Sequence, residues 1–196
     1  SADPYARAAG INGNRSMVVD MERTNPEGWE NSSAPGADSP SDVIAWEVHV
    51  ADITSSPAWN GSEKNRRLYT GAAEKGTGCM GLPTGFDYIK SLGVTHVQFL
   101  PIFDFRSVDE KRVKDADYRK KPTFGAFNWG YDPENYGLPE GSYSSDPFDG
   151  TVRIRELKTL IQAFNRAGIG VIMDVVFNHV NDGLHQSLGI SVPGYF

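Results

Sequence analysis

The chain has 196 residues, of which 39% are hydrophobic and 22% are charged, a composition typical of a folded domain and not of a disordered segment. Its formal net charge of −6 argues against nucleic acid as a partner, because phosphate binding requires a surface rich in Lys and Arg. The sequence contains no run of 18 apolar residues, so we predict no membrane-spanning helix.

The first half of the chain predicts a connector, a strand, a helix and a second strand. Residues 1–40 are rich in Asn, Gly, Pro and Ser, and we expect a loop-rich connector with one short strand at the apolar run 17–19. The apolar and β-branched run 43–50 predicts a mostly buried strand. Apolar residues at helical spacing predict a helix over 84–93, and the apolar run 94–101 predicts the next strand.

The second half begins with a long irregular stretch, 102–150, which is dense in Gly, Pro, Asp and aromatic residues. Loops of this length inside a domain are usually functional or disordered, and the aromatic residues favour an ordered, functional loop. The apolar spacing over 152–167 predicts an amphipathic helix, and 170–177 is an apolar strand interrupted only by Asp174. Strands that alternate with helices predict a parallel sheet, and periodicity alone leaves open both a doubly wound sheet and a β/α barrel.

A carboxylate therefore stands inside the last predicted strand. Asp174 is flanked by apolar residues, and a buried charge is costly unless a cation or several donors accompany it. Asn178 and His179 follow at the end of the strand, where β/α folds bind their ligands. The group indicates one wall of a binding site. A structural ion pair at Asp174 and a loop-capping role for His179 are the alternatives.

A second group of polar and aromatic residues lies in the long loop. Residues 127–133 include Trp129, Tyr131 and Asp132, and 139–143 add a further tyrosine and a carboxylate. Flat rings beside carboxylates and amides fit a carbohydrate, because one face of the sugar stacks on a ring while its hydroxyls form hydrogen bonds. The alternative is an aromatic cluster that only makes the loop rigid.

These two motifs, in this order, resemble the α-amylase superfamily of glycoside hydrolases and, within it, the type I pullulanases. Residues 174–179 are similar to the first short sequence region of the superfamily, and 128–133 are similar to the pullulanase hallmark. Residues 100–105 and the segments 3–6 and 15–20 extend the resemblance over nearly the whole chain.

The resemblance implies a (β/α)8 TIM barrel of the α/β class, of which this chain holds about the first three β/α units after a β-rich connector. Residues 1–40 would form the end of a preceding β-sandwich domain and a linker, and 41–196 the N-terminal part of the catalytic barrel. The parent protein would hydrolyse α-1,6-glucosidic branch linkages in pullulan, starch or glycogen with retention. Its partner would be an α-glucan, and the rest of the parent chain would supply the remaining barrel strands.

A retaining glycosidase needs two carboxyl groups about 5 Å apart, and Asp132 with Asp174 is the pair that this chain could offer. The resemblance argues against that pair, because the family's nucleophile, acid and third aspartate come from the fourth, fifth and seventh strands. We therefore expect no catalytic residue in this chain and no activity from the chain alone.

Four residues match substrate-binding positions of the family. Tyr131 would stack on the sugar at the cleavage subsite, and His179 would form hydrogen bonds with the hydroxyls of that sugar. Trp129 would line a neighbouring subsite, and Asp132 would help to order the same wall.

Two further residues would support the site. Asp174 matches a buried aspartate beside the arginine that flanks the nucleophile. Asn178 matches a position that ligates calcium in many amylases, but the pullulanase resemblance favours a structural role, so we assign no metal ligand. The resemblance implies that no cofactor is required and that calcium can be bound. The single cysteine leaves the compartment open, and the resemblance favours the extracellular space or the cell surface over the cytoplasm.

Three alternatives remain open. Another enzyme of the superfamily, such as isoamylase or branching enzyme, would keep the fold, and the run 129–132 argues against it. A glycan-binding fragment without catalysis is compatible with the aromatic and polar loops. The third alternative is a purely structural half-barrel.

Overall fold

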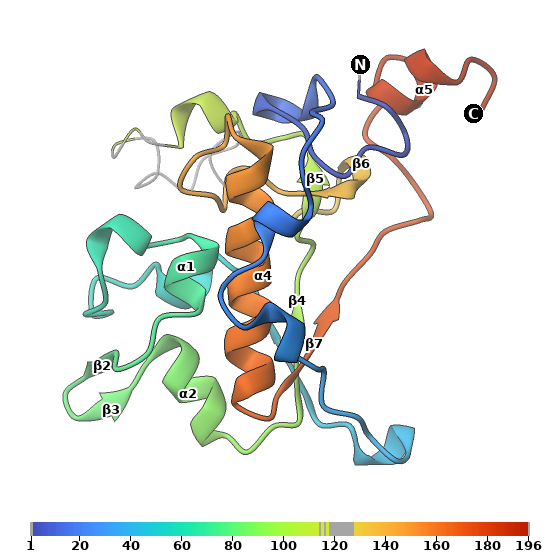
Figure 1. The fold of residues 1–196 in the computed structure, drawn as a ribbon. Helices are drawn as coiled ribbons and strands as arrows, with labels where there is room; N and C mark the ends of the chain where they lie inside the picture. The colour runs from blue at the N-terminus through green and yellow to red at the C-terminus, as the bar shows by residue number, and fades with distance from the viewer. Residues whose placement is uncertain (1, 114, 116, 118–127, 196) are drawn as a thin grey trace. The chain divides into compact units, whose positions relative to one another are not determined.

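The computed structural model of the chain describes residues 2–113, 115, 117 and 128–195 (Figure 1). The chain divides into two compact units. We call Ser1–Thr24, Pro101–Ile154 and Val175–Phe196 the loop unit, and Asn25–Leu100 with Arg155–Asp174 the sheet unit. Among the described residues, no helix combines the length and the apolar character needed to cross a lipid bilayer.

Three parallel strands lie side by side in the sheet unit, in the order β1 (Ala45–Val48), β4 (His96–Phe99) and β7 (Gly170–Met173) (Figure 1). Helix α2 (Gly85–Ser91) comes between β1 and β4 in the sequence, and α4 (Gly150–Arg166) precedes β7. The predicted parallel sheet and its alternating helices are confirmed. This strand order occurs in both folds that the sequence leaves open.

The strands are shorter and more exposed than the sequence predicts. β7 ends at Met173, so Asp174 follows the strand instead of lying within it, although its N–H still donates to the Phe99 carbonyl oxygen at 3.1 Å. The prediction of a mostly buried strand at β1 is wrong for this chain: Trp46 is 41% exposed, because β1 lies at an edge of the three-stranded sheet. The central strand β4 does bury Val97 and Phe99.

Aromatic rings form the core of the sheet unit. Phe164 of α4 packs on Phe86 of α2 with ring centroids 4.8 Å apart, and on Phe99 of β4 at 5.7 Å. All three side chains are fully buried. Burying one such side chain contributes about 1.5–3 kcal/mol, so the cluster holds both helices against the sheet.

The stretch predicted to be irregular contains a pair of antiparallel strands. β5 (Phe103–Phe105) pairs with β6 (Pro133–Pro139) in an irregular register. The sequence does not predict β6, because prolines stand at both of its ends and proline has no N–H to donate to a sheet. The strand expected at 17–19 is not formed; instead, Ala9 and Ser16 make an isolated antiparallel bridge just before it.

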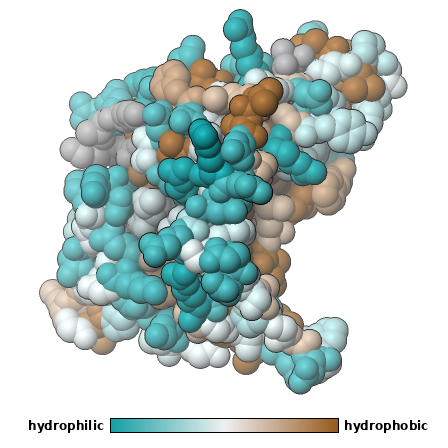
Figure 2. Space-filling model, in the orientation of Figure 1, coloured by the Kyte–Doolittle hydropathy of each residue, from teal (hydrophilic) through white to brown (hydrophobic). Residues whose placement is uncertain are grey.

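The remaining described elements are short. A small hairpin is formed by β2 (Gly78–Cys79) and β3 (Leu82–Pro83), and there are two short α-helices, α1 (Tyr69–Ala72) and α5 (Ser187–Ser191). The 3-10 helices are η1 (Ile11–Gly13), η2 (Glu22–Thr24), η3 (Trp29–Asn31), η4 (Pro40–Asp42), η5 (Asp52–Thr54), η6 (Glu63–Asn65) and η7 (Glu110–Arg112). Figure 2 shows hydrophilic residues over much of the visible face, with hydrophobic residues gathered in separate patches.

Candidate substrate-binding site

The loop that carries Trp129 and Tyr131 makes a tight turn at Gly130. Asn128 Oδ1 accepts a hydrogen bond from the Gly130 N–H at 3.0 Å. Gly130 has a φ of 95°, and a Cβ at this residue would lie 2.8 Å from the Cβ of Pro101. Glycine is the residue that adopts this angle and this approach without strain. Trp129 is 60% exposed and Tyr131 is partly exposed, so both rings keep surface for a ligand.

Asp132 anchors the end of this turn. One oxygen of its carboxylate accepts a hydrogen bond from the Asn128 side-chain amide, and the other accepts one from the Ser107 hydroxyl. The backbone carbonyl of Asp132 accepts a further bond from the Arg106 N–H at 3.1 Å. Both carboxylate oxygens are thus engaged within the loop unit, which fits an ordering role and not that of a free acid.

His179 lies against the same turn. Its Nε2 is 2.7 Å from the backbone carbonyl oxygen of Tyr131, and because a carbonyl oxygen can only accept, Nε2 is the donor. The Tyr136 hydroxyl donates to the His179 carbonyl oxygen at 3.2 Å. The structure therefore brings Tyr131 and His179 together although they are 48 residues apart in the sequence. Their predicted proximity is confirmed, and their contacts with a sugar stay predictions.

Tyr136 supports this site, although no sequence motif indicates it. Its ring packs on Phe103 at a centroid distance of 5.7 Å and on Phe177 at 5.5 Å. It therefore connects the β5–β6 pair to the segment that carries His179. No local pattern reveals this role, because the three aromatic residues come from three separate stretches of sequence.

The two predicted supporting residues fall in different units. Asp174 ends the last segment of the sheet unit and is half-buried, not fully buried, because it follows an edge strand. Asn178 belongs to the loop unit and is exposed. The pairing of Asp174 with an arginine and the structural role of Asn178 concern the complete enzyme, so they stay predictions.

The loop unit also contains a buried charge cluster of four residues: Asp104 of β5, Glu110 of η7, Glu140 after β6, and Arg153 of α4. Each of them is 1% exposed or less. Arg153 Nη2 donates to Glu110 Oε2 at 2.5 Å, and Arg153 Nη1 lies 3.6 Å from Asp104 Oδ1. The carboxylate oxygens of Glu140 accept hydrogen bonds from two backbone N–H groups at 3.0 and 2.8 Å.

The cluster contains three carboxyl groups and one guanidinium, which pairs with Asp104 and Glu110, so ionisation of all three carboxyl groups would leave their negative charge unbalanced. Burial, reinforced by repulsion from Glu110, raises the pKa of Asp104 to about 8. Burial also raises the pKa of Glu140 well above its ordinary value, and it raises the pKa of Glu110 against the opposing charge of Arg153. With a pKa of about 8, the Asp104 carboxyl group holds a proton near neutral pH, which lowers the net negative charge of the cluster.

Among the described residues, this cluster is the group whose geometry could hold a metal ion, because its three carboxyl groups offer oxygens within 4.8 Å of one another. It does not fit the calcium ion that the fold family admits. The Arg153 guanidinium already supplies a cation there, and calcium takes about six to eight oxygen ligands. A side chain at Gly141 would collide with Glu110 and Arg153, so the packing is already tight. We assign no metal to these residues.

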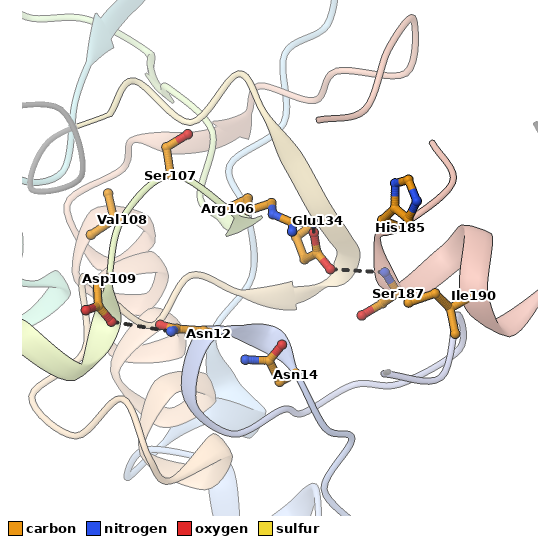
Figure 3. Close-up of a pocket in the computed structure, with 10 residues that line it drawn as sticks. All are labelled: Asn12, Asn14, Arg106, Ser107, Val108, Asp109, Glu134, His185, Ser187 and Ile190. Atoms are coloured by element: carbon orange, nitrogen blue, oxygen red, sulfur yellow. Dashed lines mark hydrogen bonds and ion pairs between the residues drawn. The ribbon is translucent and has the colours of Figure 1, made fainter. Parts of the chain in front are cut away.

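A polar cavity of about 420 Å³ is lined in part by Ser107, the residue whose hydroxyl donates to Asp132 (Figure 3). Arg106 and Glu134 form an ion pair in its wall at 3.3 Å, and Glu134 accepts a hydrogen bond from the Ser187 N–H at 3.1 Å. Figure 3 shows these residues together with Ser107, which also lines the cavity. Ser107 thus lines the cavity, and its hydroxyl donates a hydrogen bond to Asp132.

The α-amylase family, through its catalytic domain, matches residues 37–187. This is most of the chain, so the chain belongs to the α-amylase family, and its three parallel strands are part of a (β/α)8 barrel.

Its relatives within that family include pullulanases. The chain is 36% identical to the pullulanase of Bacillus subtilis (strain 168) over 197 residues, and 31% identical to the chloroplastic pullulanase 1 of Arabidopsis thaliana over 224 residues. It superposes with a TM-score of 0.88, at 47% identity, on the crystal structure of Paenibacillus barengoltzii pullulanase in complex with maltohexaose and α-cyclodextrin. These matches cover 100%, 99% and 99% of this chain but 25%, 22% and 29% of the respective proteins. The chain thus spans about a quarter of the length of the relatives it matches.

Proposed function

We propose that this chain forms part of a retaining debranching enzyme that hydrolyses α-1,6-glucosidic linkages in pullulan, starch or glycogen. The contact between His179 and the turn at Tyr131 carries the proposal, since it joins the two motifs that resemble the pullulanases. The relation to pullulanases that include a maltohexaose complex supports an α-glucan as the ligand.

In this proposal the wall at residues 128–132 binds the sugar. Tyr131 stacks on the sugar at the cleavage subsite, His179 forms hydrogen bonds with its hydroxyls, and Trp129 lines a neighbouring subsite. Aromatic faces next to amide and imidazole groups supply both the apolar and the polar contacts that a pyranose needs. Asp132 holds the wall in place through its two side-chain contacts.

The catalytic carboxylates belong, in this proposal, to parts of the parent protein beyond the three strands of this chain. Asp132 is a poor nucleophile candidate because both of its carboxylate oxygens accept hydrogen bonds from neighbouring side chains. We also propose that residues 1–40 close a preceding β-sandwich domain, with the barrel starting near 41, and that the parent is extracellular or on the cell surface. The start of the family match at residue 37 supports the boundary.

An isoamylase activity is the second candidate, because the chain is also 36% identical to the isoamylase of Flavobacterium over 146 residues. That match covers 72% of the chain, whereas the two pullulanase matches given above cover 100% and 99%. The wider coverage favours a pullulanase activity over an isoamylase activity.

The test is an assay of reducing ends released from pullulan by the parent protein, by this chain alone, and by this chain mixed with the remainder of the parent. We expect maltotriose from the parent and from the mixture, because pullulan carries α-1,6 linkages between maltotriose units. Release by this chain alone would show that its own residues are catalytic. A parent that cleaves glycogen but leaves pullulan intact would favour isoamylase.

A further inference from the structure

Two side chains hold the carboxylate of Asp132, and they have different origins. Asn128 belongs to the turn itself, so its hydrogen bond only closes the turn on itself. Ser107 follows β5, and its hydroxyl connects the turn to a strand. The neighbouring Arg106 N–H donates to the Asp132 carbonyl oxygen at 3.1 Å. Arg106 therefore contacts the backbone of Asp132, and Ser107 contacts its side chain.

The segment that carries Ser107 is itself fixed. The Phe105 N–H donates to Glu140 Oε2 at 3.0 Å, and Phe105 is buried against Tyr143 with ring centroids 5.8 Å apart. The Arg106 side chain pairs with Glu134 of β6 at 3.3 Å. Because the flanking segment is held in place, the Ser107 hydroxyl has a defined position, and it can fix the position of the Asp132 carboxylate.

We propose that Ser107 is a positioning residue, which acts through the Asp132 carboxylate to hold the turn 128–132 in its sugar-binding geometry. Asp132 directly follows Tyr131, and the Tyr131 carbonyl oxygen is the group that meets His179 Nε2 at 2.7 Å. Any displacement of Asp132 therefore moves the stacking ring and the histidine contact together. This inference rests on the proposed function, because it concerns the same wall.

The test uses the parent enzyme with Ser107→Ala and Ser107→Thr, and measures kcat and KM on pullulan. We expect Ser107→Ala to lower kcat/KM about tenfold, because a hydrogen bond to a charged group is lost. Threonine keeps a hydroxyl that can donate to the Asp132 carboxylate, so Ser107→Thr should restore most of the activity.

A matched control separates this role from the general loss of a serine. Ser91→Ala removes a hydroxyl that donates to the Tyr88 carbonyl oxygen at 2.7 Å at the exposed end of α2, and it should leave kcat/KM unchanged. Thermal unfolding is recorded for every variant, and kinetics are measured well below the lowest midpoint. A lower midpoint for Ser107→Ala with unchanged kcat/KM would overturn the proposal, because the hydroxyl would then serve stability alone.

A double-mutant cycle shows whether Ser107 acts through Asp132. If it does, Ser107→Ala causes no further loss of kcat/KM in an Asp132→Ala background, whereas independent effects multiply. Multiplying effects would refute the inference while leaving the proposed function standing. A wild-type parent without activity on pullulan would refute the proposed function first, so the two failures are distinguishable.

Discussion

Replacement of Arg153 by methionine tests the buried charge cluster most directly. The guanidinium is the cation that faces Asp104 and Glu110, and its Nε and Nη2 also donate to the Pro147 carbonyl oxygen at 3.0 and 2.5 Å. Nη2 donates in addition to the Gly10 carbonyl oxygen at 3.0 Å. Methionine retains an unbranched apolar stem but offers none of these donors, so the carboxyl groups lose their cation and both carbonyl oxygens lose the hydrogen bonds that Arg153 donates.

The structure sets the size of the expected effect. Removing one partner of a buried ion pair costs about 3–5 kcal/mol, because the other charge is left without compensation. Protonation of the remaining carboxyl groups offsets part of this cost, and the offset is greatest at low pH because burial has already raised their pKa values. We therefore expect a loss of about 3–5 kcal/mol at pH 8 and a smaller loss at pH 5.

The assay is urea unfolding of the parent protein at both pH values, followed by tryptophan fluorescence. Arg155→Met is the control, because Arg155 is exposed on the same helix, and its loss should change the free energy of unfolding by less than about 0.5 kcal/mol. A loss below about 1 kcal/mol for Arg153→Met at pH 8, or a larger loss at pH 5 than at pH 8, would refute the reasoning.

Three more predictions concern single groups. Burial raises the pKa of Asp104 from 3.8 to about 8, so between these pH values the folded state holds a proton that the unfolded chain has released. The free energy of unfolding should therefore fall as the pH rises through this interval. Asp104→Asn should flatten this decline, which urea unfolding at several pH values would measure. Gly130→Ala should destabilise by about 1–3 kcal/mol in urea and lower kcat/KM on pullulan, since φ is 95° and the new Cβ meets Pro101; unchanged kinetics would contradict the geometry. Tyr131→Ala should lower kcat/KM about 100-fold while Tyr131→Phe retains most activity, because stacking needs the ring, and equal losses would argue against stacking.

The sheet unit could be predicted from the sequence because its signals are local. The apolar runs around Trp46, Val97 and Ile172 and the amphipathic spacing of α4 each describe one element, and the alternation of these elements dictates the parallel sheet. The error at β1 has a physical cause. Burial depends on what covers a strand, which periodicity within the strand does not report.

The loop unit could be predicted only in part. The contact between Tyr131 and His179 was accessible through two motifs that resemble one family. The β5–β6 pair was not, because prolines mask β6 and its register is irregular. The buried charge cluster could not be predicted either, since Asp104, Glu110 and Arg153 form no common motif in the sequence and come together only in the folded chain.

The loop unit contains contacts between residues 10–13 and residues far along the sequence, and these contacts constrain how it folds. The Asn12 N–H donates to Glu110 across 98 residues, and the Gly10 carbonyl oxygen meets Arg153 across 143 residues. These contacts have high contact order, so forming them means closing long loops, which slows folding. During synthesis, residues 10–13 leave the ribosome long before Glu110 and Arg153 exist. Docking of this segment on the buried charge cluster therefore cannot precede the synthesis of Arg153.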